Sequence, residues 1–432
     1  MLPLLLPAVL AGEPSIPNET FTLDNGLTVV LVEDHSVPFV QVNVWYWVGS
    51  ANEEPGRTGF AHLFEHLMFQ GSQHAPDDYF KPLQKVGGQV NGTTNLDRTN
   101  YFEGVPSEFL PLALYMESDR MGFLLDALDE QKLQNQKDVV RNERRQRYDN
   151  VPYGNAWPTL LENLFPEGHP YHTATIGRHE DIEAATLEDV KAFFRKWYVP
   201  NNATLTICGD FDPKVAKRQV KRWFGDLPAG EEPAPRTFTP VVLDGEKRVR
   251  ATDDVPFEKV WIAWPTPKLF APGDAELDLL SQALTSGKDS RLYESLVHER
   301  QIAQDVSAAQ VSHNLQSLYM IVATAAEGHT AAEVVAAVDE ELAKLRESGV
   351  TAEEVATAKT AYEVGFWEAL LTISGKADQV QSYLRYLGKP DGLADDLARY
   401  RAATPDSVNA ALRQWLPPDK RLVLEIVPEV KP

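Results

Sequence analysis

The sequence contains the same pattern twice, at a constant offset in residue number. Segments that begin at Pro38, Thr186 and Trp197 have counterparts that begin at Pro256, Thr404 and Trp415, an offset of 218 in each case. A repeat of this length has the size of a whole domain, so the chain is a duplication of one α/β unit. Each copy mixes strand-like, hairpin and helical segments, which favours an α+β fold over a doubly wound parallel sheet.

Composition places the boundaries of the two units. A chain of 432 residues is too long for one ordinary core. Residues 229–240 are polar and rich in proline, as linkers are, so we expect one domain over 17–228 and another over 241–432. Residues 1–16 begin with a short apolar run, and we expect a signal remnant or a disordered segment there. That run favours a periplasmic or secreted protein, and the alternative is a cytoplasmic one.

The charge balance excludes several classes of partner. The formal net charge of −22 argues against nucleic acid and anionic membranes, and it favours neutral or basic substrates. The single cysteine, Cys208, rules out an internal disulfide and a metal site made of thiolates. Apart from the first residues, no segment approaches the ~20 apolar residues of a membrane span.

One strongly apolar helix is predicted over residues 57–71, and Thr58 can cap its start. His62 and His66 are four residues apart, so they lie on one face of this helix with Glu65 beside them. Two neutral imidazoles at this spacing suit zinc, and the flanking carboxylate can take a proton from water. The order His-x-x-Glu-His is the inverted zincin motif. The alternative is a buried helix with two incidental histidines, but the chain has only ten histidines in all.

The second copy of the repeat tests this motif. Helices are predicted over 108–125 and 130–148, and Glu143 falls on the apolar side of the second one, where a carboxylate needs either a metal or a neighbouring arginine. At the offset of 218, His62, Glu65, His66 and Glu143 correspond to Leu280, Ala283, Leu284 and Ala361. None of these four can bind a metal or move a proton. The second half therefore keeps the sequence pattern of the fold but lacks the side chains that could bind a metal or transfer a proton.

Strand-like segments surround the helix of the motif. Residues 21–32 predict a hairpin around Asn25-Gly26, and residues 39–48 alternate apolar and polar side chains as a strand does. The segment over 87–103 is polar, rich in threonine and β-like. It can form an edge strand that holds an extended peptide by backbone pairing, although an ordinary exposed hairpin fits the sequence equally well.

Together these features resemble the pitrilysin/insulinase family of zinc peptidases. The resemblance rests on the two homologous halves, on His62-x-x-Glu65-His66 with Glu143 placed 77 positions after His66, and on the runs over 62–71, 87–91 and 290–293. It covers the chain from about residue 17, and the chain size is most similar to the bacterial branch related to mitochondrial processing peptidase. It implies two halves, each with a mostly antiparallel sheet and helices, that face each other around a chamber.

The same resemblance assigns roles to individual residues. It implies one Zn²⁺ per chain, held by His62, His66 and Glu143, with Glu65 as the general base for peptide hydrolysis. It also implies that an extended peptide, rather than a folded protein, pairs with the segment that contains Gly88, Gln89, Val90 and Asn91. His₂Glu sites accept several divalent ions, so the sequence alone does not separate zinc from manganese or cobalt.

Two positions depart from the family pattern. Gln136 stands where many active members have a second glutamate, and we expect it to support the metal ligands through hydrogen bonds. Val297 and Gln304 stand where active members have an arginine and a tyrosine that hold the substrate and the oxyanion. We therefore expect a homologous partner subunit, in a heterodimer, to supply that pair. The alternative is a non-catalytic zinc-containing subunit that binds peptides or supports a larger assembly.

Overall fold

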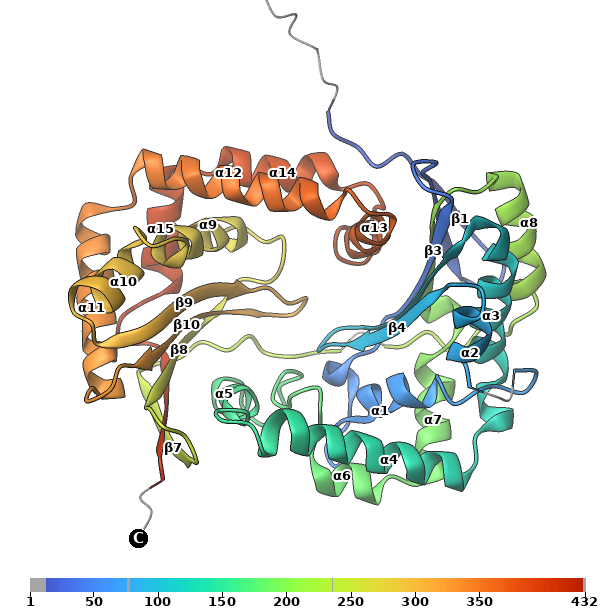
Figure 1. Cartoon of the computed structure of the whole chain (residues 1–432), viewed down its shortest axis with the longest axis horizontal. Coiled ribbons are helices and arrows are strands. Elements are labelled where there is room, and N and C mark those ends of the chain that lie inside the picture. Colours follow the sequence, from blue (N-terminus) through green and yellow to red (C-terminus); the bar gives the residue numbers. More distant parts are fainter. Residues whose placement is uncertain (1–12, 76–77, 235, 430–432) are drawn as a thin grey trace, which may run out of the picture.

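The computed structural model describes residues 13–75, 78–234 and 236–429. Most of the expected signal segment, residues 1–12, lies outside the described residues. The chain forms two halves, each with one mixed sheet and helices packed on it, and the halves face each other across the molecule (Figure 1). The expected α+β fold with two similar halves is therefore confirmed.

The first sheet has six strands in the order β1-β2-β6-β3-β5-β4. Strands β2 and β6 are parallel, and the other neighbours are antiparallel. The predicted hairpin over residues 21–32 is formed by β1 and β2, and Gly26 in its turn has a φ of 87°, which glycine adopts without strain. The bounds are β1 Glu19–Thr22, β2 Thr28–Glu33, β3 Phe39–Tyr46, β4 Gln89–Thr94, β5 Thr99–Pro106 and β6 Ala203–Gly209.

The second sheet has five strands in the order β7-β11-β8-β10-β9, and again one pair, β7 and β11, is parallel. The bounds are β7 Lys247–Asp253, β8 Lys259–Thr266, β9 Ala303–Val311, β10 Ser317–Ala325 and β11 Leu422–Pro428. The sequence repeat brings β5 onto β10 and β6 onto β11, with their starts matched to within a single position. The duplication read from the sequence is thus also a duplication of topology.

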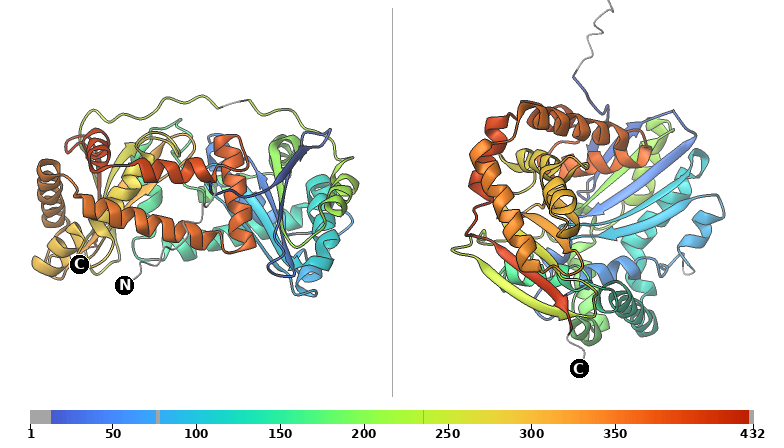
Figure 2. Two further views of the ribbon diagram at one scale, coloured as in Figure 1. Left: turned by 90° about the horizontal axis from the view of Figure 1, so that it is seen from above. Right: turned by 60° about the vertical axis from the view of Figure 1, so that its left-hand side comes forward.

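Helices pack on both sheets and connect their strands (Figure 2). In the first half they are α1 Phe60–Leu67, α2 Phe80–Gln84, α3 Leu110–Ala127, α4 Glu130–Arg144, α5 Ala156–Leu164, α6 His179–Ala184, α7 Leu187–Trp197 and α8 Pro213–Phe224. In the second they are α9 Asp274–Thr285, α10 Arg291–Tyr293, α11 Ala331–Ser348, α12 Ala352–Ala369, α13 Ile373–Leu387, α14 Leu393–Ala402 and α15 Pro405–Trp415.

The two halves exchange one helix each. Helix α13 of the second half packs on β3 and β6 of the first sheet, whereas α5 of the first half packs on β8 and β11 of the second. The side-chain amide of Gln381 on α13 donates to the carbonyl oxygens of Asn43 and Thr204, at 2.9 and 3.0 Å. Because α5 and α13 occupy corresponding places in the sequence repeat, the exchange is reciprocal.

This exchange explains a feature of β3. The strand alternates apolar and polar side chains as predicted, yet Gln41 and Asn43 on the polar side are buried along with the valines. Helix α13 covers that side and supplies hydrogen-bond partners for it. A polar strand face is thus a contact between the halves rather than a solvated surface.

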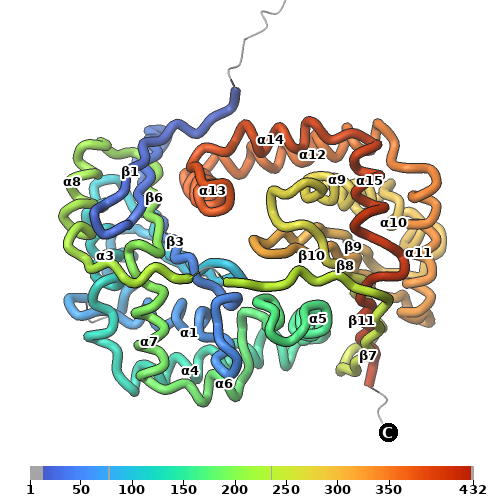
Figure 3. Tube along the Cα trace, turned by 180° about the vertical axis from the view of Figure 1, so that it is seen from behind, coloured from blue at the N-terminus to red at the C-terminus, as the bar shows by residue number. Residues whose placement is uncertain are grey.

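The expected linker runs in an extended path between the halves (Figure 3). The described residues between β6 and β7 form α8 and then no helix or strand from residue 228 to residue 246. Asn201 and Gly230 exchange two hydrogen bonds, and the guanidinium of Arg236 donates to the carbonyls of Ala51 and Glu53, so the linker is fixed to the first half. Within the described residues, no helix is long and apolar enough to cross a bilayer.

Gln381 offers a test of the contact between the halves. Gln381→Ala removes two buried hydrogen bonds to the first sheet, so we expect the free energy of unfolding to fall by about 2–3 kcal/mol. Urea denaturation of the whole chain measures the change. Gln414→Ala, at an exposed position on α15, serves as the control and should stay within about 0.5 kcal/mol of the parent chain. Equal effects of the two substitutions would contradict the anchoring role of α13.

Candidate metal centre

Helix α1 is positioned by contacts at its first turn. Its N-cap is Gly59, with a φ of 85°, so the prediction that Thr58 caps the helix is wrong. The Glu53 carboxylate takes that role, because its two oxygens accept from the backbone N–H groups of Gly59 and Ala61, both at 2.8 Å. Thr58 instead donates its hydroxyl to Asp181, at 2.5 Å. Burial raises the pKa of Glu53 to about 8, and the two N–H groups at the positive end of the helix oppose this shift.

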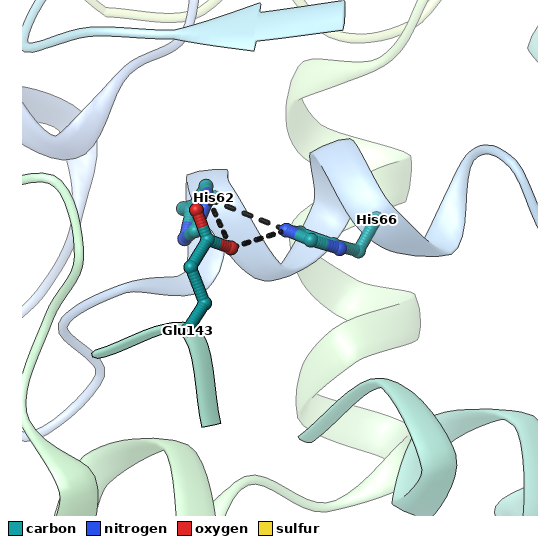
Figure 4. A group of neighbouring side chains, drawn as sticks. All are labelled: His62, His66 and Glu143. Atoms are coloured by element: carbon teal, nitrogen blue, oxygen red, sulfur yellow. Dashed lines mark hydrogen bonds and ion pairs between the residues drawn. The ribbon is translucent and has the colours of Figure 1, made fainter. Parts of the chain in front are cut away.

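The side chains of His62, His66 and Glu143 lie together in the structure (Figure 4). The two histidine Nε2 atoms are 3.3 Å apart, and Glu143 Oε2 lies 3.1 Å from His66 Nε2 and 3.6 Å from His62 Nε2. Ligand atoms placed 2.0–2.1 Å from one zinc ion in a tetrahedron are about 3.3–3.4 Å apart. The donor set and its spacing therefore fit a zinc ion with three protein ligands.

The electrostatics of these groups also suit a metal. Burial, assisted by neighbouring His66, lowers the pKa of His62 to about 4, so its imidazole is neutral at neutral pH. The hydrogen bond with His66 lowers the pKa of Glu143, which keeps this carboxylate ionised. Arg147 contacts the other Glu143 oxygen, Oε1, at 2.8 Å. Oε2 is thereby left to face the histidines.

Glu65 lies on the same helix and faces the same space as the ligands. Its Oε2 accepts a hydrogen bond from the hydroxyl of Thr94 on β4, at 2.6 Å. Burial raises the pKa of Glu65, which makes its carboxylate a stronger base. The side chain is therefore placed to accept a proton beside the three ligand atoms.

A cavity of about 480 Å³ opens over this group. Its lining comes from α1, β4, the end of α4 and the loop after α5, all in the first half of the chain. The lining residues are His62, Glu65, His66, Asn91, Gly92, Thr93, Thr94, Glu143, Arg147, Tyr148, Thr175 and Ile176.

The predicted peptide-binding residues lie at or near this cavity. Strand β4 is the outermost strand of the first sheet, with β5 on one side, so the predicted edge strand is present. Asn91 lines the cavity, whereas Gln89 and Val90 lie further along β4 and Gly88 directly precedes it. The part of the strand nearest to the ligands is Asn91–Thr94, which begins where the segment predicted from the sequence ends.

The positions that depart from the family pattern lie away from the cavity lining. Gln136 is buried on α4, two turns before Glu143. Val297 lies in the π-helical turn Glu294–Glu299 and packs against the second core. Gln304 is the second residue of β9, and its side-chain amide donates to the carbonyl of Ala325, at 2.8 Å. Neither Val297 nor Gln304 adds a charged or phenolic group to the site.

The sequence offered a neighbouring arginine as the alternative partner of Glu143, and Arg147 makes that contact. Sequence reasoning did not place Arg147 and Tyr148 in the cavity, and it missed the contact of Thr94 with Glu65. Arg147 and Tyr148 belong to a π-helical turn, Arg145–Asp149, that follows α4 and turns them toward the metal ligands. The spacing of Glu143 and Arg147 by four residues is a signal that could have found this ion pair. No sequence signal links Thr94 to Glu65, because 29 positions separate them.

Comparison with known proteins gives two family matches on this chain. Residues 28–166 match the model described as insulinase (peptidase family M16), and residues 184–362 match the model described as the peptidase M16 inactive domain. The first match contains the candidate metal centre, and the second covers most of the half in which the sequence has no candidate ligands. The chain is also 31% identical over 376 residues to the zinc protease PqqE of Helicobacter pylori, covering 85% of this chain and 83% of that protein.

Solved structures share the fold. The crystal structure of a protease from Helicobacter pylori matches with a TM-score of 0.89 and 27% identity, over 96% of this chain and 100% of that one. The periplasmic protease PqqL from Escherichia coli matches with a TM-score of 0.78 and 19% identity, over 96% of this chain but 48% of that one. A unit like this chain thus makes up about half of PqqL.

Removal of one ligand tests the metal centre. Glu143→Ala leaves two histidines to hold the ion, so we expect zinc affinity to fall by more than about 100-fold. Calorimetric titration of the metal-free chain with zinc measures it. His35→Ala is the matched control, because His35 is an exposed histidine paired with Asp210, and this variant should still bind one zinc per chain. Unchanged affinity in Glu143→Ala would refute the assigned ligand set.

Proposed function

Because this chain belongs to the insulinase family of peptidases, family M16, we propose that it is a zinc metalloendopeptidase, or the zinc-binding subunit of one, that acts on unstructured peptides. One observation carries the proposal. Two imidazoles, the Glu143 carboxylate and the separate carboxylate of Glu65 meet in one open cavity, which is the arrangement that metal-assisted hydrolysis needs.

Each group in the cavity has a distinct role in this proposal. When bound by His62, His66 and Glu143, zinc supplies a Lewis acid and lowers the pKa of water at the site. Glu65 takes a proton from that water and later returns it to the leaving amine. Its raised pKa favours the first of these transfers. Arg147 keeps one oxygen of Glu143 occupied and so holds the other toward the histidines.

The proposed substrate is an extended peptide that pairs with the free side of β4. An edge strand offers backbone N–H and C=O groups to a peptide without regard to its side chains. Asn91–Thr94 lines the cavity, so a peptide paired there runs beside Glu65 and the metal ligands. Gly88, Gln89, Val90 and Asn91 extend the same pairing edge away from the metal.

We propose further that a homologous subunit completes the enzyme. Val297 and Gln304 cannot provide the arginine and the tyrosine that active relatives use, and the described residues of the second half contribute nothing to the cavity lining. A heterodimer with a chain that carries this pair would restore those groups. The match of this chain to about half of PqqL, named as a periplasmic protease, supports both the pairing of two such units and an exported location.

A second candidate function follows from the same departures. Val297 and Gln304 also fit a subunit that binds zinc and peptide without turnover, or that supports a larger assembly. The intact set of His62, His66, Glu143 and Glu65 favours the enzyme over this candidate, because a binding protein has no need of a general base.

Replacing the proposed base separates these functions. Glu65→Gln keeps the size of the side chain but cannot accept a proton, so we expect zinc to stay bound and peptide hydrolysis to fall by about 10²–10⁴-fold. A quenched fluorescent peptide without fixed structure, incubated with the zinc-loaded protein, measures turnover. Asp226→Asn, a change of the same kind outside the cavity, should keep the parent rate. Equal turnover in Glu65→Gln and the parent chain would refute this role.

The partner is tested by comparing the purified chain with the chain in extract of its own cells. The loss of one oxyanion donor typically costs about 10²–10³ in kcat, so we expect extract to raise Glu65-dependent turnover by about 100-fold or more. Extract with the Glu65→Gln chain gives the background. Full turnover by the purified chain alone would refute the need for a partner. Zinc binding without turnover in either condition would favour the second candidate function.

A further inference from the structure

A single hydroxyl connects the general base to the edge strand. Thr94 is the last residue of β4, and its Oγ1 donates to Glu65 Oε2 at 2.6 Å. Both side chains are partly buried and both line the metal cavity. A hydrogen bond to a carboxylate in such a site is stronger than one between neutral groups. The contact therefore ties α1 to the strand that we have proposed to pair with the peptide.

Strand β4 contacts the aliphatic part of the Glu65 side chain as well as its carboxylate. A side chain at Gly92 would place its Cβ 3.2 Å from Glu65 Cγ and 3.1 Å from the ring of Tyr101. Glycine at this position allows β4 to approach α1 closely. Glu65 is thus held at two points by the same strand, at its stem beside Gly92 and at one oxygen by Thr94.

The turn that follows Thr94 is fixed from both halves of the chain. The Asp97 carboxylate accepts from the hydroxyl of Tyr171 at 2.5 Å and from the backbone N–H of Asn314, in the second half, at 3.0 Å. The backbone N–H of Leu315 donates to the same tyrosine hydroxyl, at 2.8 Å. The end of β4 consequently has a defined position, and the hydroxyl of Thr94 is presented to Glu65 from a rigid support.

A carboxylate without this support has more freedom. The last torsion of a glutamate side chain is broad and roughly two-fold, so an unpaired Glu65 samples several orientations of its oxygens. With Oε2 engaged by Thr94, Oε1 is the oxygen that remains for the proton of the attacking water. A small misplacement of a catalytic group can cost about 100-fold in rate.

We propose that Thr94 is a positioning residue for the hydrolysis proposed above, and that its hydroxyl fixes the orientation of Glu65 from the strand that we propose to bind the peptide. Thr94 itself does not touch the reacting atoms. It selects which oxygen of Glu65 faces the water, and it does so from the strand on which the peptide lies. The proposal rests on the proposed function, and it adds a residue that orients the general base without touching the reacting atoms.

The test compares Thr94→Val with Thr94→Ser in the full zinc-loaded chain, in the presence of its source extract. Valine keeps the shape of threonine and removes the hydroxyl, so we expect kcat to fall by about 10–100-fold with KM within about two-fold. Serine keeps the hydroxyl and should restore kcat to within about three-fold of the parent. Thr206→Val, on β6 of the same sheet, is the control, because its buried hydroxyl has no partner among the described residues.

A binding measurement gives a readout that does not depend on turnover. A peptide hydroxamate binds the metal and gives a proton to the base, so its affinity reports the orientation of Glu65. Calorimetry should show an affinity about ten-fold lower for Thr94→Val and for Glu65→Gln, and a parent-like affinity for Thr94→Ser. Zinc affinity should be the same in all four proteins.

The outcomes separate this proposal from the function on which it rests. Parent-like kcat and hydroxamate affinity in Thr94→Val would overturn the role of Thr94, even where Glu65→Gln is inactive. A fall in kcat in Thr94→Val that Thr94→Ser does not restore would overturn it too. The fall would then come from a change in the strand and not from the missing hydroxyl. If no peptide is turned over by the parent chain, the proposed function fails, and the hydroxamate affinities of the valine and serine variants still decide whether Thr94 orients Glu65.

Discussion

The site depends on bringing two helices from distant parts of the chain into a fixed register. His62 and His66 are set by α1 alone, because four residues make slightly more than one helical turn. Glu143 comes from α4, so its distance of 3.1 Å from His66 depends on how α1 and α4 pack. The carboxylate of Glu53 holds the first turn of α1, and this contact replaces the side-chain cap that the helix lacks. The three residues of the candidate metal centre are thus placed by packing and capping rather than by the motif itself.

Much of this arrangement could be predicted from residue spacing. The constant offset between the two copies of the repeat predicted two similar halves, and helical spacing placed His62 and His66 on one face of a helix. That Glu143 joins them was implied by the family resemblance, and the three side chains lie together in the structure. Contacts that join elements remote in sequence could not be predicted. The polar face of β3 gave no sign that α13 covers it, because Gln381 lies 338 positions after Asn43. No single-sequence pattern records partners at such distances.

The second half supports the first although it carries none of the ligands. Helix α13 covers one face of the first sheet, and the backbone of Asn314 and Leu315 holds the turn after β4 through Asp97 and Tyr171. In the same way, helix α5 of the first half packs on β8 and β11 of the second sheet. Loss of the chemical groups at Leu280 and Ala361 therefore leaves these mechanical contacts intact. The family model that matches most of this half is described as an inactive domain. This half nevertheless contributes contacts that hold the first sheet and the turn after β4 in place.

The charged groups of the cavity all come from the first half of the chain. Glu65 and Glu143 place two carboxylates beside each other, and their repulsion is lowered by Arg147, the histidines and the hydroxyl of Thr94. A divalent cation held by His62, His66 and Glu143 would lower this repulsion further, which favours metal binding at this position. The same cation would attract a peptide carbonyl toward β4.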